Sequence, residues 1–540
     1  MVTQGRRAES DGVSDSTNVR GMTDTGFWRL AESDGSWTAL VDTDGTKVSA
    51  GELVGRANQL ANGLVAAGLE PGDTVAVVLP NCREFIELYL AALQVGLVFT
   101  PINHHLVGPE IAYIVNDSEA SVLVGHDQFG DALTAAAGEL SLAAEHRFAI
   151  GSVDGYRPFA ELAADQPDTA PPGRTAGMAM HYTSGTTGRP KGVRRAMAEM
   201  DPSDLGSLYA MFMMLFGVQP FDDNVHLTGS PLYHTAVLMW TGNSLHLGHT
   251  VVLMEKWTPE ECLRLIDQHR VTTSHMVPTQ FHRMLQLPEE VRSKYDVSST
   301  RCMVHAAAPC PPEIKKQMIS WWGNSIMEYY AATEGGGTII TADEWLSKEG
   351  SVGKAWAGAE IRIYDDEGNR LGPNEIGTIY MALSQATFEY KGDKKKTEDN
   401  RIYDGETAFF TVGDVGELDD DGYLFLRDRK IDMIISGGVN IYPSEIEGAF
   451  LTNPVVGDVA VFGIPNDDWG EEVKAVIEPA DGHTADEQYE ADLRAWAEAN
   501  LASYKRPRSY DFTDAMPRES TGKLFKRKLR DPYWEGRAQI

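Results

Sequence analysis

Between Trp37 and Ile102, hydrophobic positions alternate between the spacing of an amphipathic helix and that of a buried strand. Ser49 is a suitable N-cap for the first helix, whose apolar side carries Leu53, Ala57, Leu60, Leu64 and Ala67. After a Gly/Pro turn, the pattern predicts a strand over 74–79, a helix over 82–94 and a strand over 98–101. This β–α–β order is typical of a parallel sheet covered by helices.

The alternation continues along the chain. Short apolar runs predict further strands at 121–124, 178–182, 250–254 and 272–277. We therefore expect an α/β fold, with a large N-terminal domain of helix-covered β-sheets. The acidic, proline-containing stretch at 163–173 is interpreted as a linker.

The pattern changes at a turn over 420–422 and a charged joint over 427–430. Beyond the joint, the spacing predicts a compact α+β segment with a strand over 431–436, a helix from Ser444, strands over 456–462 and 472–478, and a helix over 486–501. A chain of 540 residues is too long for one core, so two or more domains are expected. We predict a disordered tail at 1–25, an N-terminal domain at 26–429 and a small C-terminal domain at 430–540.

Composition narrows the class of protein. An apolar content of 42% and a charged content of 23% are ordinary for a globular enzyme. A net charge of −32 argues against nucleic acid as a partner. Basic residues gather between Lys505 and Arg530, a local reversal that suits either an anionic ligand or a solvated basic face.

The four cysteines (Cys82, Cys262, Cys302 and Cys310) show no CxxC pair and no zinc-type spacing, so we expect reduced thiols in a cytoplasmic protein. No signal peptide is evident, and no transmembrane segment is expected: the longest apolar run, 208–218, is shorter than the roughly 20 residues that span a bilayer. This methionine-rich run is either core or the lining of a pocket for a flexible apolar ligand. The oligomeric state is left open, a homodimer included.

The segment Tyr182–Gly192 combines glycines and hydroxyl side chains with the cations Arg189 and Lys191. Glycines let backbone amides converge on one anion, and hydroxyls add donors, so the composition is that of a phosphate-binding loop. It is not the Walker pattern, because Pro190 stands where that pattern has glycine and no Ser or Thr follows the lysine. The alternative is an ordinary surface loop.

Further clusters lie downstream of this loop: Pro-Leu-Tyr-His-Thr-Ala at 231–236, Ala-Ala-Ala-Pro at 306–309, Tyr-Ala-Ala-Thr-Glu-Gly at 330–335, Thr-Val-Gly-Asp at 411–414, Asp-Arg-Lys at 428–430, Ser-Gly-Gly at 436–438 and Pro-Arg-Glu-Ser-Thr-Gly-Lys at 517–523. Singly, most are weak signals. In this order, over about residues 27–535, they closely resemble the superfamily of AMP-forming acyl-CoA synthetases and adenylation enzymes, which includes luciferases and peptide-synthetase adenylation domains.

The resemblance implies ATP, Mg²⁺ and CoA as cofactor and co-substrates, and it implies roles for the motif residues. The predicted ATP- and AMP-binding residues are Thr183, Ser184, Gly185, Thr186, Thr187, Gly188, Lys191, Ala306, Ala307, Ala308, Tyr330, Thr333, Asp414 and Arg429. Glu334 is the expected magnesium ligand, since this hard cation prefers oxygen. Lys523, on a C-terminal domain expected to be mobile, would bridge the carboxylate and the α-phosphate as a catalytic residue.

Cations are needed because activation brings two anions together. At about 4 Å and an effective dielectric near 20, two unit charges repel by roughly 4 kcal/mol. Chemistry of this type depends on positioning and electrostatics, so no nucleophilic side chain is required. Thr333, Glu334, His234 and Lys523 are the predicted catalytic set.

The pair Tyr233-His234 resembles the aromatic–His pair of acyl- and aryl-CoA synthetases rather than the aspartate of amino-acid adenylation domains. The small-molecule substrate is therefore expected to be a carboxylic acid without an α-amine. Ser436, Gly437 and Gly438 would face CoA after the C-terminal domain rotates. The resemblance also implies an acyl pocket lined by Tyr233, His234, Gly335 and Gly336. Met239-Trp240 and the 208–218 run suggest that this pocket is roomy and apolar, as a fatty or bulky alicyclic acid would require. Alternatively, the glycines serve backbone turns.

Several positions depart from the family pattern: Ala331 where glycine is usual, Ala355 where proline is frequent, Phe409-Phe410 in place of a tryptophan, and Ile431 at the hinge. None of these removes a charge needed for adenylation, but Ile431 puts the hinge assignment in question. The leading hypothesis is an ATP-dependent acid–CoA ligase. The alternatives are a ligase that loads a carrier protein, a luciferase-type oxygenase, and a non-catalytic nucleotide-binding protein on this fold. The last alternative is disfavoured because the chain retains Lys523, Glu334, Asp414 and Arg429.

Overall fold

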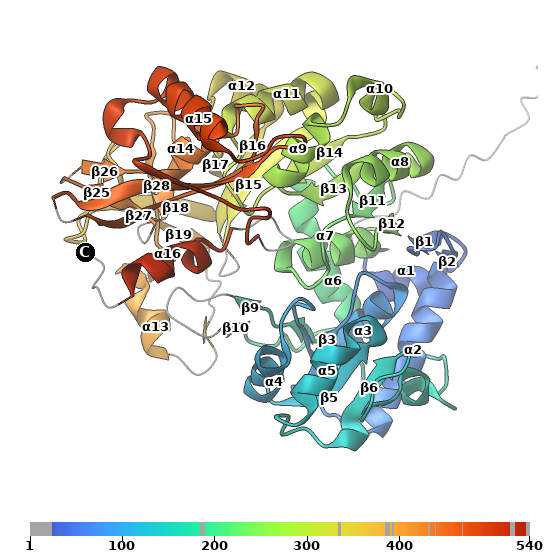
Figure 1. Cartoon of the computed structure of the whole chain (residues 1–540). Helices are drawn as coiled ribbons and strands as arrows, with labels where there is room; N and C mark the ends of the chain where they lie inside the picture. Colours follow the sequence, from blue (N-terminus) through green and yellow to red (C-terminus); the bar gives the residue numbers. More distant parts are fainter. Residues whose placement is uncertain are drawn as a thin grey trace, which may run out of the picture.

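The structure is a computed structural model that describes residues 24–183, 190–332, 336–383, 389–390, 394–429, 432–437, 439–466, 468–518 and 524–535. Figure 1 shows a chain in which helices and sheets alternate, and in which the C-terminal elements lie over the sheets of the middle of the chain. The mixed α/β fold predicted from the sequence is confirmed. The tail predicted at 1–25 lies almost entirely outside the described residues.

One sheet of six parallel strands forms the first half of the large body. Its order is β7 (Arg157–Pro158), β6 (Arg147–Ile150), β5 (Ala120–His126), β3 (Thr74–Val78), β4 (Val98–Pro101) and β8 (Met178–Ala179). Helices α1 (Phe27–Ser33), α2 (Ala50–Ala66), α3 (Arg83–Gln94), α4 (Gly108–Asp117) and α5 (Gly130–Ala137) accompany it. Ser49 caps α2 as predicted: it accepts from the Glu52 amide, and Glu52 accepts from the Ser49 amide in return.

A second sheet has nine strands among the described residues. Its order is β17 (Lys354–Ala355), β16 (Gly337–Thr341), β15 (Ile326–Ala331), β14 (Cys302–His305), β13 (Thr273–Met276), β11 (Val225–Thr228), β12 (Thr250–Leu253), β1 (Thr38–Val41) and β2 (Lys47–Ser49). Helices α6 (Pro202–Met214), α7 (Thr235–His246), α8 (Pro259–His269), α9 (Pro278–Leu285), α10 (Glu289–Arg292), α11 (Pro312–Trp322) and α12 (Ala342–Ser347) belong to this half. A buried apolar cluster that includes Phe85, Leu238 and Val251 joins the two sheets.

The strand predicted at 178–182 is wrong as a single element. The chain forms β8, which pairs with β4, and then β9 (Tyr182–Thr183), which pairs with β10 (Lys191–Arg194) in another sheet. Met180 still donates to the Phe99 carbonyl before the chain changes sheets. Every position of the run is buried or half-buried, so the pattern does not reveal the change.

The remaining sheet of the large body is antiparallel. It contains β18 (Ala359–Tyr364), β19 (Gly377–Leu383), β21 (Arg401–Asp404), β22 (Thr407–Phe410), β23 (Asp414–Leu418) and β24 (Leu424–Arg429), while the short β20 (Glu389–Tyr390) pairs with β10 and α13 (Lys394–Asp399) follows it. The turn predicted at 420–422 connects β23 and β24. The linker predicted at 163–173 is pinned to α2, because Asn58 and Asn62 donate to backbone carbonyls at 167–169.

The C-terminal segment, residues 432–535, has its own core. Its strands are β25 (Ile434–Ser436), β26 (Val439–Ile441), β27 (Val456–Asn466), β28 (Gly470–Pro479) and β29 (Ser509–Phe512), and its helices are α14 (Pro443–Phe450), α15 (Glu487–Asn500) and α16 (Lys526–Trp534). The buried side chains of this core come from residues 434–510. The division at 429/430 itself stays a prediction.

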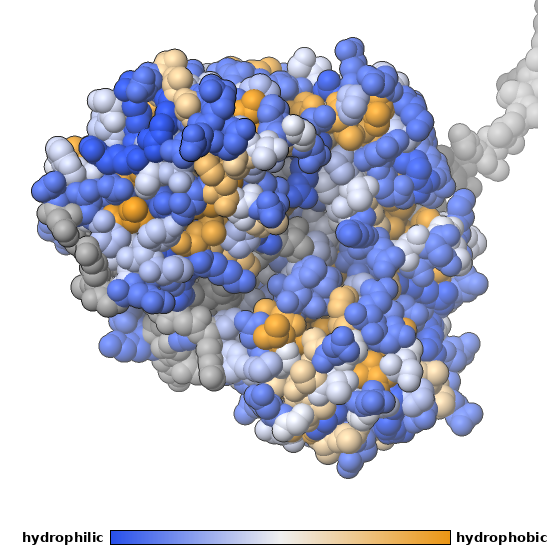
Figure 2. All heavy atoms as spheres, viewed as in Figure 1, coloured by the Kyte–Doolittle hydropathy of each residue, from blue (hydrophilic) through white to orange (hydrophobic). Residues whose placement is uncertain are grey.

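Polar residues cover most of the face shown in Figure 2, with small apolar patches between them. The methionine-rich run is only half core: Ala210 and Met213 are buried, whereas Leu208, Tyr209 and Met211 are about half exposed. Within the described part of the chain, no helix combines the length and the apolarity needed to cross a bilayer. The four cysteines are free thiols, as expected.

Candidate active site

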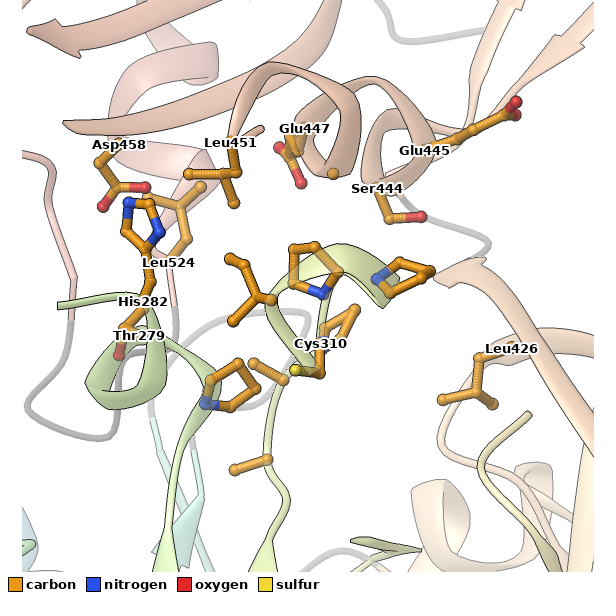
Figure 3. A pocket seen from close by; sticks show the side chains of 18 of the residues that line it. Thr279, His282, Cys310, Leu426, Ser444, Glu445, Glu447, Leu451, Asp458 and Leu524 are labelled. Atoms are coloured by element: carbon orange, nitrogen blue, oxygen red, sulfur yellow. The ribbon is translucent and has the colours of Figure 1, made fainter. Parts of the chain in front are cut away.

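The large body and the C-terminal segment enclose a cleft of about 2080 Å³. The large body contributes Lys191, the segment 306–308, Tyr330 and Asp414 to its lining. From the C-terminal segment come side chains of α14, the start of β27, and the pair Arg518 and Leu524. Figure 3 shows several of these side chains facing one another across the cleft. The cleft therefore brings together sequence motifs that are far apart along the chain.

The floor of the cleft lies at the carboxyl ends of parallel strands. Ala306–Ala308 follow β14 directly, and Tyr330 is near the end of the neighbouring strand β15, which pairs with β14 in parallel. Ligands of open α/β sheets bind at such ends. Ala307 adopts a left-handed backbone with φ of 72°, and the methyl side chains of this segment leave a shallow slot beside the Tyr330 ring.

Tyr330 and Asp414 are held together. The Tyr330 hydroxyl donates to Oδ2 of Asp414 over 2.7 Å. Asp414 is the first residue of β23, and its partner in the register is Arg429 at the end of β24. The Arg429 side chain lies outside the described residues. Tyr330 and Asp414, two of the predicted ATP- and AMP-binding residues, are thus adjacent in the fold.

The two ends of the predicted phosphate loop are paired and anchored. Thr183 of β9 faces Lys191 of β10 in the register of an antiparallel ladder. The Tyr182 hydroxyl donates to Asp117, and the Tyr113 hydroxyl donates to the Pro190 carbonyl. Ser184, Gly185, Thr186, Thr187 and Gly188 lie outside the described residues, as does the Thr183 side chain, so their roles stay predictions.

Thr333, Glu334 and Gly335 also lie outside the described residues. The glycines that follow have a backbone reason. Gly336 has φ of 77°, and a Cβ on Gly337 would lie 2.2 Å from the Tyr330 carbonyl oxygen. The backbone explanation of this glycine run, left open by the sequence, therefore holds for Gly336 and Gly337.

A buried asparagine, which the sequence analysis missed, holds the Tyr233-His234 segment. Asn81 donates to the carbonyls of Ser230 and Met254, and its side-chain oxygen accepts from the Leu232 amide. Tyr233 is buried, and its ring centroid lies 4.2 Å from that of His234, which precedes α7. Neither ring is among the residues that line the large cleft. Pro80 and Asn81 look like an ordinary turn between a strand and a helix, so nothing in the sequence marks this asparagine as the anchor of a distant segment.

Near Met239-Trp240, where a roomy apolar pocket was expected, the described residues form a cluster of packed aromatic rings. Phe212 and Phe216 of the α6 region pack edge-to-face against Trp240 and Tyr329, with centroids 5.0–6.4 Å apart. Trp240 is fully buried, and His275 lies 3.0 Å from the Tyr329 hydroxyl. Aromatic rings fill this side of the sheet because their shapes interlock, which residue counts do not predict.

An ion pair lies beneath the slot. Lys315 of α11 and Glu328 of β15 are both buried and share a short contact, and the Lys315 ammonium lies 4.9 Å from the centre of the Trp345 ring. Burial raises the pKa of Glu328, and the lysine opposes that shift. Burial also drives the pKa of the neighbouring His305 well below its usual value, so this ring is neutral. The pair ties β15 to α11 two residues before Tyr330.

In the C-terminal segment, Arg518 and Leu524 pair as an antiparallel bridge, so the two ends of the segment that contains Lys523 meet at the cleft. Lys523 itself and Gly438 lie outside the described residues.

Ser436 and Gly437 do not line the cleft. Gly437 donates to the Trp469 carbonyl, and its φ of 58° and the Trp469 ring above it leave no room for a side chain. Trp469 is 47% exposed, and the Arg508 guanidinium lies 5.3 Å from its ring centre.

Comparison with known proteins identifies the same motifs. The family profile described as AMP-binding enzyme matches residues 27–390, and the profile of the AMP-binding enzyme C-terminal domain matches residues 445–523. A feruloyl-CoA synthase of an Amycolatopsis species is 35% identical over 90% of this chain and 94% of its own. The fatty acid–acyl-carrier-protein ligase ScoC of Streptomyces coeruleorubidus is 31% identical over 92% and 94%. The crystal structure of ATP-bound MatB from Rhodopseudomonas palustris superposes with a TM-score of 0.76, at 30% identity, and covers 94% of this chain and 98% of MatB.

Proposed function

The chain belongs to the AMP-binding enzyme family, and from this premise we propose that it activates a carboxylic acid with an apolar body and transfers the acyl group to CoA. At the level of the reaction it is an AMP-forming acid–CoA ligase that uses ATP, Mg²⁺ and CoA. The observation that carries the finer proposal is the cleft, in which Ala306–Ala308, Tyr330 and Asp414 face Arg518 and Leu524. Within this proposal, residues 26–429 bind the substrates and residues 430–540 form a second, movable unit.

The residues present suit the nucleotide. A carboxylate held by a phenol, beside a slot of methyl side chains, offers an acceptor for ribose hydroxyls and a flat apolar surface for adenine. No cluster of three potential metal ligands occurs among the described residues. Mg²⁺ commonly retains waters and is held by one or two carboxylates together with substrate phosphates. Glu334 is the proposed protein ligand, and the ion would neutralise charge on the polyphosphate.

Each remaining residue has a stated part in the first step. A carboxylate oxygen of the acid attacks the α-phosphorus, and the bond to the leaving pyrophosphate breaks. The loop Thr183–Gly188 and Lys191 would bind the β- and γ-phosphates, and Thr333 would donate to the α-phosphate. Lys523 would stabilise the charge shared by carboxylate and phosphate, and Arg429 would bind on the ribose side. His234 beside Tyr233 would face the acid.

CoA is the proposed acceptor because of the surface beside Ser436 and Gly437. An exposed indole with a guanidinium over it can stack on the adenine of CoA and pair with its phosphates. The glycines at 437 and 438 would leave space for the pantetheine arm. In this second step the CoA sulfur forms a bond to the acyl carbon, AMP leaves, and the thiol proton passes to solvent.

The body of the acid is proposed to be apolar, with room either for a planar ring or for a chain. The similar proteins include one named for feruloyl-CoA and one named for a fatty acid. Phe216 packs edge-to-face against Trp240 and Tyr329, so the rings on this side of the sheet lie against one another. A compact aromatic acid is therefore the first candidate, and a fatty acid is the second.

The runner-up is transfer to a carrier protein, since one similar protein is named for that acceptor. The deciding experiment measures pyrophosphate and AMP release from ATP with a panel of aromatic and fatty acids, with and without CoA. We expect AMP release to require CoA. Acyl-AMP that accumulates despite CoA and is discharged by a carrier protein would favour the runner-up, and failure to release pyrophosphate with any acid would refute the enzyme.

A further inference from the structure

Asp458, at the start of β27, is the centre of a buried ion pair inside the C-terminal segment. Its Oδ1 accepts from Nη2 of Arg518 over 2.6 Å, and its Oδ2 contacts Nε of the same guanidinium. The carboxylate is nearly inaccessible, with Asp458 8% exposed. Since Arg518 also pairs with Leu524, this contact holds both ends of the segment that contains Lys523 against β27.

A second ion pair holds the other side of that segment. Nζ of Lys526, the first residue of α16, lies 2.8 Å from Oε1 of Glu447 on α14. The same carboxylate accepts from the Val461 amide over 2.7 Å. The two ion pairs tie Arg518 and Lys526, which stand on either side of that segment, to the body of the C-terminal unit.

The large body meets this unit at Asp458. Figure 3 shows His282, on α9, pointing across the cleft toward Asp458. The His282 ring faces the Gly457 backbone, and its Nε2 lies 3.1 Å from Nε2 of Gln286, which donates to it. Burial lowers the pKa of His282, and the Asp458 carboxylate partly opposes this shift. The ring is thus neutral, with one nitrogen donating and the other accepting.

Two further contacts join the same faces. Leu451, after α14, packs against the apolar core of the large body. At the joint, Oδ2 of Asp428 accepts from the Ser444 amide over 2.9 Å, in the first turn of α14. All of these contacts belong to the orientation in which Leu524 and Arg518 face Ala306–Ala308.

We propose that His282 and Asp458 are positioning residues that dock the C-terminal domain on α9 for adenylation. This inference rests on the proposed function. The Arg518–Asp458 pair lies within the C-terminal domain and survives a rotation, whereas the His282 contact joins two domains and has to break. Loss of the His282 contact therefore affects formation of the acyl adenylate and leaves thioester formation alone. Neither residue touches substrate in this role.

The test compares His282→Ala with His269→Ala, which removes a similarly half-buried histidine from the neighbouring helix α8. Single-turnover pyrophosphate release reports the first half-reaction, and thioester formation from supplied acyl-AMP and CoA reports the second. We expect His282→Ala to slow the first by about threefold to tenfold at saturating ATP, the worth of one hydrogen bond, with the KM for ATP unchanged. The second half-reaction and both rates of His269→Ala should match those of the unmodified protein.

Two more variants separate docking from folding. His282→Asn keeps a donor near the position of Nδ1 and should restore most of the lost rate. Asp458→Asn should slow the same half-reaction by more than His282→Ala does, because it also weakens the ion pair with Arg518. The double variant should be no slower than Asp458→Asn alone, because the contact with His282 is lost in both. Equal losses in both half-reactions would assign the pair a purely structural role and overturn the proposal.

Hydrogen exchange tests the docking contact without any substrate. In His282→Ala, amides of α9 and of residues 456–459 should exchange faster than in the unmodified protein, and His269→Ala should show no such change. Unchanged exchange at both segments would overturn the docking contact even if no acid were adenylated. If an acid is adenylated and His282→Ala matches the unmodified protein, the inference fails while the proposed function stands.

Discussion

The Tyr330 hydroxyl and the Asp414 carboxylate form a hydrogen bond of 2.7 Å between residues 84 positions apart, in the lining of the cleft. The bond orients the Asp414 carboxylate, which we propose accepts hydrogen bonds from the ribose hydroxyls of ATP. Asp414→Ala should therefore raise the KM for ATP by about tenfold to a hundredfold, the usual worth of a hydrogen bond to a charged group. Tyr330→Phe, which retains the ring, should raise it by about threefold. Steady-state kinetics at saturating acid measures both, and an unchanged KM in Asp414→Ala would contradict the assignment.

Lys523→Ala separates the two half-reactions. Loss of a charge placed at the transition state should slow adenylation by about a hundredfold to a thousandfold. Thioester formation from supplied acyl-AMP should stay within about twofold, since Lys523 has no proposed part in it. Lys528→Ala is the matched control, because it removes an exposed lysine from the same basic run. Equal losses in both half-reactions would show that the role of Lys523 is assigned wrongly.

Trp469→Ala tests the proposed CoA surface. Removal of a ring that stacks on a base costs about 1–3 kcal/mol, so the KM for CoA should rise about tenfold. Pyrophosphate release in the absence of CoA should not change. Tyr209→Ala, which removes an exposed ring from α6, serves as control. A rise in the KM for ATP rather than for CoA would place the nucleotide of CoA elsewhere.

Lys315→Met should destabilise the large body strongly. The change leaves Glu328 buried without its cation, and breaking a buried pair in this way costs about 3–5 kcal/mol. Lys315→Met combined with Glu328→Gln removes both charges and should recover much of that loss. Chemical denaturation of the variants measures the difference. A single variant as stable as the unmodified protein would mean that Glu328 is already protonated.

Buried histidines should make the protein sensitive to acid. Burial lowers the pKa of His246, His249 and His275 to about 4 each. In His246 the Nδ1 atom accepts from the Phe27 amide, which requires the neutral ring. Unfolding restores a pKa near 6.5, so between about pH 6.5 and 4 the unfolded state binds more protons, and stability falls as pH falls, by about 1.4 kcal/mol per pH unit for each group.

Calorimetry in buffers of different ionisation enthalpy would count the protons taken up on unfolding at pH 5. The His246→Gln variant should take up about one proton fewer than the unmodified protein. An equal proton count would mean that His246 is already charged in the folded state.

Local elements were predictable where one physical rule decides them. The cap at Ser49 and the apolar stripe of α2 follow from spacing alone. The motif residues of the site were also recognisable, because phosphate and ribose need particular side chains. Their adjacency was not: the bond between Tyr330 and Asp414 depends on how β15 and β23 come together in the fold.

What the sequence could not show is how surfaces fit. The chain leaves one sheet for another between β8 and β9 while its side chains stay buried or half-buried, so the two strands were expected to be one. The ring cluster around Trp240 replaces an expected pocket, since residue types do not reveal interlocking shapes. His282 of the large body points toward Asp458 of the C-terminal segment, and neither residue carries a local sequence pattern.

The nine-stranded sheet ends in two very short strands, the three residues of β2 and the two residues of β17. Short edges offer few unpaired amides and carbonyls to another chain. Self-association by extension of this sheet is therefore disfavoured, both in an ordered dimer and in aggregates that grow strand by strand. A homodimer of this protein would have to form through surfaces other than the edges of this sheet.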